Sequence, residues 1–143
     1  MIKKSTESRA TLRARRVLGA CYLAAGVGKC FPSWESTEGR LEQALEANRG
    51  TAIEEPTAWL LREHQPVNAL VASAMTGAGV AMAAEEGPLV DAALIGTLPM
   101  LGAFVTVLHR ALPVVIPVDL AFAGAALWIL HKRRRSRREN RGA

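Results

Sequence analysis

Basic residues gather at both ends of this 143-residue chain and leave long apolar stretches between them. Thirteen of the 18 Lys and Arg residues lie within residues 1–16 and 132–141. Short basic segments that flank apolar spans remain on the cytoplasmic side of a bilayer. We therefore expect both ends to face the cytoplasm and the chain to cross the membrane an even number of times.

Four apolar stretches agree with this parity, and each is close to the roughly 20 residues that a helix needs to cross a bilayer. Lys29 interrupts the first stretch, but its long side chain can reach toward the headgroups. The four predicted spans cover about 17–34, 67–84, 89–108 and 111–130.

The predicted fold is all-α, a four-transmembrane-helix bundle with an interfacial helical loop between helices 1 and 2. The membrane domain covers residues 17–131, with an outer loop at 35–66. A basic cytoplasmic N-terminus (1–16) precedes the membrane domain, and a basic cytoplasmic tail (132–143) follows it. The Arg-rich and Ala-rich composition suggests a bacterial genome, so we expect a multi-pass protein of the bacterial inner membrane.

Tryptophan supports these boundaries, because Trp favours the headgroup zone of a bilayer. Trp34 ends the first span, Trp59 precedes the second and Trp128 lies near the end of the fourth. We expect all three to act as interface anchors. The alternative, a soluble Ala-rich helical bundle, would need polar faces at helical spacing, and spans two to four have almost none.

The loop at 35–66 holds seven acidic residues against three arginines. Ser36 or Thr37 can cap a helix that runs through Ala47, with Gly50 as a stop, and a short turn follows at 57–64. The segment either lies in the interface plane as a lid over the bundle or serves as a plain connector.

The pI near 9.9 raises the question of nucleic acid binding. The basic residues adjoin apolar spans and form no stripe with interleaved aromatic residues, so we expect no nucleic acid partner. Attraction to anionic lipid headgroups, about 1 kcal/mol per Lys or Arg near the surface, explains them better.

Three ionisable residues lie within the predicted spans: Lys29, Asp91 and Asp119. Each would cost a few kcal/mol if left alone in lipid. Lys29 and Asp119 fall at a similar depth, so we predict that they pair, either as part of a polar pocket or proton path or as a buried clip between spans one and four. Asp91 is expected to cap the third span.

No metal site is expected, since His64, His109 and His131 lack metal-ligand spacing. Small residues spaced four apart occur in spans one (Ala20, Ala24, Gly28) and two (Ser73, Gly77, Ala81). They predict close helix packing without identifying which helices meet.

Residues 16–19 (RVLG) and 22–29 (YLAAGVGK) resemble the opening helix of the DoxX-like membrane proteins. The arrangement of spans is similar over most of the chain, but the sequence motif itself covers only residues 16–31. Gly26 and Lys29 match positions of that motif. Gly77 and Gly79 match the second helix only loosely, and Glu63 alone corresponds to the acidic residue at its entrance.

The resemblance implies an association with membrane redox complexes and with quinone or thiol chemistry. The expected role is that of a partner or subunit of such a redox system. One alternative is a stand-alone enzyme that binds a quinone or lipid-like substrate near Lys29, and another is a non-redox scaffold or permeation protein. The sequence identifies no catalytic residue and no cofactor.

Overall fold

A computed structural model describes residues 7–31, 33–34, 36–84 and 86–142 of the chain. These residues form six helices and no strand, which confirms the all-α class. The count differs from the four-helix prediction, because the outer loop folds into two helices of its own. The helices are α1 (Arg9–Gly28), α2 (Thr37–Ala47), α3 (Glu54–Arg62), α4 (His64–Ala84), α5 (Pro88–Leu108) and α6 (Val115–Gly142).

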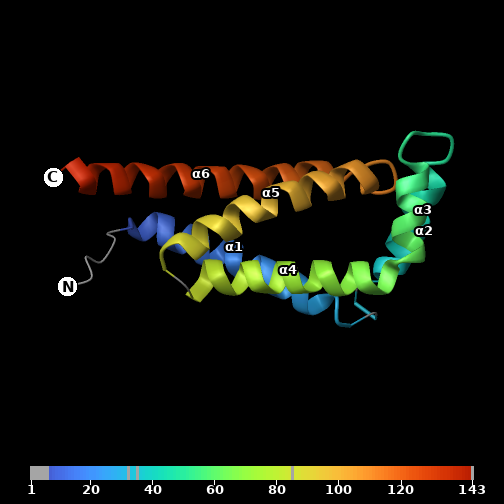
Figure 1. Cartoon of the computed structure of the whole chain (residues 1–143), viewed down its shortest axis with the longest axis horizontal. Helices are drawn as coiled ribbons and strands as arrows, with labels where there is room; N and C mark the ends of the chain where they lie inside the picture. The colour runs from blue at the N-terminus through green and yellow to red at the C-terminus, as the bar shows by residue number, and fades with distance from the viewer. Residues whose placement is uncertain (1–6, 32, 35, 85, 143) are drawn as a thin grey trace.

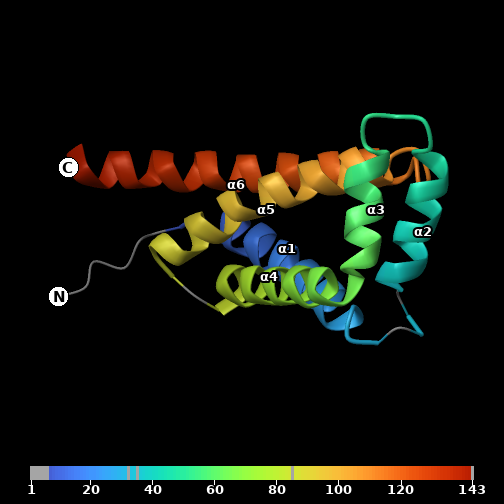
Figure 2. The same ribbon diagram turned by 45° about the vertical axis from the view of Figure 1, so that its right-hand side comes forward.

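The four long helices run lengthwise, with α1 packed along α4 and α5 packed along α6 (Figure 1). Helix α1 begins, α4 ends, α5 begins and α6 ends at one end of the molecule, which we name the basic end. Helices α2 and α3 stand side by side across the other end, the capped end (Figure 2). Each long helix therefore runs from one end of the bundle to the other.

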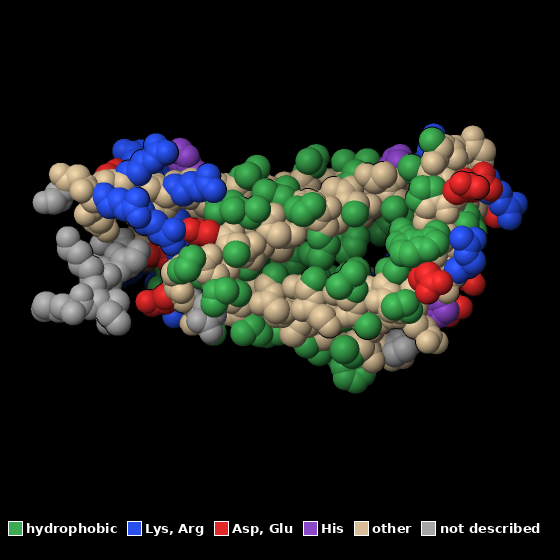
Figure 3. Space-filling model, in the orientation of Figure 1, with side chains coloured by type: hydrophobic (Ala, Val, Ile, Leu, Met, Phe, Trp, Pro, Cys, Tyr) green, Lys and Arg blue, Asp and Glu red, His purple; other side chains and the backbone are tan. Residues whose placement is uncertain are grey.

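Three helices are long and apolar enough to cross a membrane: α4, α5 and α6. Only 22% of the residues in the most apolar window of each are buried, so most of their surface is left for lipid. Charged side chains gather at the two ends of the molecule, and the region between shows mainly hydrophobic and uncharged groups (Figure 3).

Helix α1 differs from the span predicted at 17–34. It starts at Arg9 and includes four arginines, and it ends at Gly28, followed by turns. Its apolar part, residues 17–28, is about 18 Å long at 1.5 Å per residue. This length is short of the roughly 30 Å of bilayer hydrocarbon.

The predicted second and third spans match α4 and α5 closely, whereas α6 begins later and ends much later than residues 111–130. Its helix continues through the arginine-rich tail to Gly142. Arginine is a good helix former, and an ion pair between Arg135 and Glu139 (Nε to Oε1, 3.0 Å) supports this last part.

Glycine lets α1 and α4 touch through their backbones. A Cβ on Gly79 would lie 2.6 Å from Leu23 N and 2.7 Å from Gly19 O. A Cβ on Gly26 would collide with Thr76 Oγ1 and lie 2.7 Å from Thr76 N. Close approach through small residues is how helices associate in lipid, where apolar burial contributes little.

Most of the small residues noted for their four-residue spacing do not take part in this contact. Ala20, Ala24, Ser73 and Gly77 are exposed, and a Cβ on Gly77 would meet nothing within 4 Å. These four residues therefore lie away from the α1–α4 contact. Four-residue spacing does not single out the packed faces, because Ala and Gly are frequent all round these helices.

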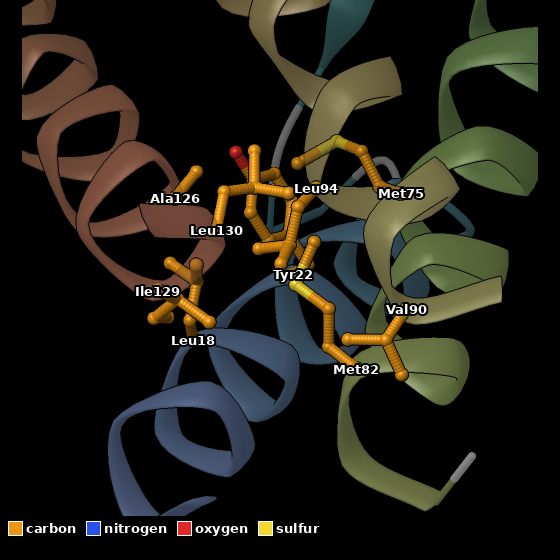
Figure 4. Close-up of a cluster of buried hydrophobic side chains, with 9 residues drawn as sticks. All are labelled: Leu18, Tyr22, Met75, Met82, Val90, Leu94, Ala126, Ile129 and Leu130. Carbon is orange, nitrogen blue, oxygen red and sulfur yellow. The ribbon is translucent and has the colours of Figure 1, made fainter. Parts of the chain in front are cut away.

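A cluster of buried side chains joins all four long helices toward the basic end (Figure 4). The Tyr22 side chain lies in its middle and is 1% exposed. The cluster contains Leu18, Tyr22, Met75, Met82, Val90, Leu94, Ala126, Ile129 and Leu130.

The loop helix that was predicted to run through Ala47 is confirmed as α2. Ser36 caps it by accepting a hydrogen bond from Gly39 N (3.1 Å), and Gly50 follows with a φ of +72°. The fully buried Asn48 donates from Nδ2 to Val107 O (2.9 Å) and to Thr57 Oγ1 (3.2 Å). These bonds tie α2 and α3 to the end of α5.

Candidate functional site

Three polar side chains from three different helices are buried inside the bundle. Tyr22 of α1, Thr97 of α5 and Asp119 of α6 are 1%, 2% and 7% exposed. Thr97 lies beside the Tyr22 hydroxyl, and Asp119 lies within electrostatic range of it. We name these three residues the polar cluster.

Two atoms of the polar cluster are left without a hydrogen-bond partner in the described structure: the Tyr22 hydroxyl and Asp119 Oδ2. The Thr97 hydroxyl gives its proton to Leu94 O (2.8 Å) of its own helix, so it has none to donate to Asp119. Buried polar atoms are nearly always paired. An unpaired carboxyl and phenol at membrane depth therefore mark a candidate site for a ligand or a proton.

Packing holds the phenol in place. The ring of Phe122 meets the Tyr22 ring edge to face, with centroids 5.4 Å apart and planes at 89°. Phe122 lies three residues after Asp119, so both project from the same side of α6. Tyr22 is therefore fixed between a carboxyl and an aromatic edge.

A hollow of about 310 Å³ lies between α4 and α5, next to the polar cluster. Thr97 is part of the polar cluster and also lines the hollow. The remaining wall is almost wholly apolar and consists mainly of small residues: Ala74, Gly77, Ala78, Ala81, Leu89, Ala92, Ala93, Gly96 and Met100.

The structure places the two residues of the predicted intramembrane pair on different elements. Lys29 follows the last residue of α1, is partly buried, and accepts a hydrogen bond at its backbone oxygen from Asn68 Nδ2 (3.2 Å). Asp119 is the fifth residue of α6. The ion pairs among the described residues include none between Lys29 and Asp119, so this pair stays a prediction.

An ion-pair network closes the basic end, with Arg133 at its centre. Arg133 is 7% exposed, and it pairs with Asp91 (Nε to Oδ1, 2.8 Å) and with Glu7 (NH1 to Oε1, 3.0 Å). It also donates to Gly87 O (3.0 Å), and Arg137 binds the other oxygen of Asp91 (2.5 Å). Asp91 is in the first turn of α5, but its carboxyl oxygens bind Arg133 and Arg137 of α6, which were not predicted as partners, so its capping role stays a prediction.

Burial alone would lower the pKa of Arg133, but its hydrogen bonds to Asp91 and Glu7 outweigh this effect and raise the pKa above its usual value. A second buried arginine, Arg15, donates to Met82 O (2.6 Å) and pairs with Glu7 (3.3 Å). Glu7 thus joins α1 to α6, while Arg15 joins α1 to α4.

The remaining predicted residues take structural positions. Gly26 is buried against α4, which gives this pattern position a packing role. Trp34, Trp59 and Trp128 are 78%, 53% and 44% exposed. Such exposure suits contact with lipid headgroups, and their role as anchors stays a prediction.

The described residues contain no group of three or more His, Cys, Asp or Glu side chains that could hold a metal ion. Cys21 and Cys30 are both free and exposed. In this part of the chain, buried polar side chains gather in the polar cluster, in the ion-pair network and at the Asn48–Thr57 hydrogen bond.

Sequence reasoning identified Asp119 but missed Tyr22, Thr97 and Arg133. Tyr22, the single tyrosine of the chain, is the one phenol within an apolar stretch, and this was a usable signal. Thr97 carried little signal, because a threonine in a membrane helix commonly bonds to its own backbone.

The fold and the site define an all-helical protein with three membrane-capable helices and buried polar groups between them. A family model matches residues 12–143, and the chain belongs to this family, described as a family of unknown function (DUF6041). No solved structure matches the chain.

A curated relative is named "Oxidoreductase PigB", from Serratia sp. (strain ATCC 39006). It is 36% identical over 117 residues, which make up 81% of this chain and 17% of the relative. The chain therefore spans about a sixth of the length of this relative.

Proposed function

We propose that this chain is the membrane part of a redox system, acting as a partner or subunit of an oxidoreductase rather than as the catalyst. The observation that carries the proposal is its 36% identity to a region of a protein named as an oxidoreductase. Because the matched 117 residues are 17% of that protein, about 690 residues make up the whole. Its other regions are large enough to hold several domains.

The resemblance of residues 16–31 to DoxX-like membrane proteins supports the same role, since that resemblance also implies membrane redox chemistry. The buried residues add no catalytic constellation to contradict it. Within the described ranges, the buried polar side chains form ion pairs, form structural hydrogen bonds such as that between Asn48 and Thr57, or belong to the polar cluster.

The proposed setting is the bacterial inner membrane, with four crossings and the basic end in the cytoplasm. We place the fourth crossing at α1, whose full 20 residues extend about 30 Å although only its last 12 residues, about 18 Å, are apolar. Its exposed arginines Arg9, Arg13 and Arg16 can reach anionic headgroups. The exposed basic residues of the α6 tail extend beyond the headgroups to meet a cytoplasmic partner.

Native mass spectrometry of the gently solubilised complex tests this function. We expect a redox-active protein to be retained at a fixed ratio, and we expect Arg134→Glu with Arg138→Glu to release it. The matched control reverses charge at the capped end, Arg40→Glu with Arg49→Glu, and should retain the partner. Recovery of this chain alone, or equal retention in both variants, would contradict the proposal.

A further inference from the structure

The polar cluster contains two hydrogen-bonding atoms that no other group of the described structure pairs with. The Tyr22 hydroxyl and Asp119 Oδ2 are buried without partners, and the Thr97 hydroxyl beside Tyr22 donates its proton to its own helix. Leaving a buried polar atom unpaired costs about 1–3 kcal/mol, and a charged one costs more. The site is thus prepared for a group that arrives from outside.

The chemistry of the two unpaired atoms restricts this group. A carboxylate oxygen only accepts hydrogen bonds, whereas a phenol both donates and accepts. A hydroxyl group can donate to Asp119 and accept from Tyr22. A ketone can only accept, and a protonated amine can only donate.

The hollow between α4 and α5 offers space for an apolar chain attached to that hydroxyl. Its volume of about 310 Å³ is at the small end of the range for ligand sites, about 300–1,000 Å³. It lies on helices whose outer surfaces are suited to lipid, and Thr97 forms part of its wall and of the polar cluster. A molecule dissolved in the bilayer could enter sideways without crossing water.

We propose that the polar cluster and this hollow together bind a membrane-soluble alcohol: a molecule with an apolar chain and a terminal hydroxyl. Asp119 accepts the hydroxyl proton in a hydrogen bond, and Tyr22 donates to the hydroxyl oxygen. Small residues of α4 and α5 line the chain. Binding of this kind goes beyond association with a redox partner and does not require one.

The test uses tritiated 1-decanol and the full chain in lipid nanodiscs, with empty nanodiscs of the same lipid as background. We expect saturable binding above background that unlabelled 1-decanol displaces, while 2-decanone and decylamine do not. Asp119→Asn and Tyr22→Phe should each weaken binding by about 10-fold to 100-fold, the effect of losing a hydrogen bond in a buried site that includes a charged group. Thr106→Val, at an exposed threonine of α5, should leave binding unchanged.

A second variant guards against loss of folding. Gly96 lines the hollow, and a Cβ there would meet nothing within 4 Å, so Gly96→Leu should fill the hollow and keep the helices. Helix content by circular dichroism should match the wild type, while 1-decanol binding falls. Uptake no greater than that of empty nanodiscs, preference for the ketone or amine, or full binding by Gly96→Leu would overturn the proposal.

Decanol binding is measured on this chain alone, without a redox partner. Loss of a redox partner in native mass spectrometry would refute the proposed function and leave decanol binding unaffected. The reverse result would refute the alcohol site and leave the proposed function standing.

Discussion

At the scale of single residues, glycine sets how closely α1 and α4 approach. Gly79→Ala would bring a methyl group to 2.6 Å from Leu23 N, a backbone atom that cannot move aside alone. We expect a loss of about 1–3 kcal/mol of unfolding free energy, as for other overpacked sites. Denaturation of the purified protein in detergent, followed by circular dichroism, measures it.

Gly77→Ala is the matched control, two residues away on the same helix and open to its surroundings. It should leave stability unchanged or raise it by up to about 1 kcal/mol through helix propensity. Equal effects of the two substitutions would show that α1 and α4 are not in backbone contact.

Arg133 is the residue whose loss should damage the basic end most. Arg133→Met removes a buried partner that Asp91 and Glu7 share, and removing one member of a buried ion pair costs about 3–5 kcal/mol. We expect a loss near the lower end of this range, because Arg137 still pairs with Asp91 and Arg15 with Glu7. Arg134→Met, at the next and exposed position, should change stability by less than about 0.5 kcal/mol. Chemical denaturation of both variants measures the difference.

A double-mutant cycle with Asp91→Asn sharpens this prediction. The two substitutions together should cost less than the sum of their separate effects, because each removes the same interaction. Strict additivity would mean that the Arg133–Asp91 contact contributes nothing.

At the scale of elements, Asn48 attaches α2 and α3 to the rest of the bundle. Asn48→Leu removes the hydrogen bonds to Val107 O and Thr57 Oγ1, so α2 and α3 should detach from the end of α5. We expect faster proteolysis within residues 37–62 with little change in the unfolding midpoint of the long helices. Gln43→Ala, at an exposed position of α2, should be cleaved at the wild-type rate.

The elements also show what the sequence could and could not reveal. Apolar runs and turn residues predicted α4, α5 and the Ser36-capped α2, because hydrophobicity and capping are local properties. The length of α1 and the α1–α4 contact depended on which faces meet, and a chain rich in Ala and Gly offers many equivalent faces. The partners of Asp91 were missed because Arg133 lies 42 residues away in the sequence, and no local pattern joins the two residues.

At the scale of the whole molecule, the proposed function and the proposed ligand site both depend on how the bundle is oriented in the bilayer. The start of α1 and the end of α6 share the basic end, while α2 and α3 occupy the opposite one (Figure 1). The proposed cytoplasmic partner and the sideways entry of a ligand both require the long axis to cross the membrane. The length and apolar composition of α4, α5 and α6 agree with this orientation.

Cysteine labelling in intact bacterial cells tests this claim most directly. With Cys21 and Cys30 replaced by alanine, single cysteines are introduced as Glu42→Cys in α2 and as Arg138→Cys in α6. A membrane-impermeant maleimide should label position 42 in cells with a permeabilised outer membrane, and position 138 only after the inner membrane is disrupted. Labelling of both positions before that disruption, or of position 138 alone, would contradict a bundle that crosses the membrane with its basic end in the cytoplasm.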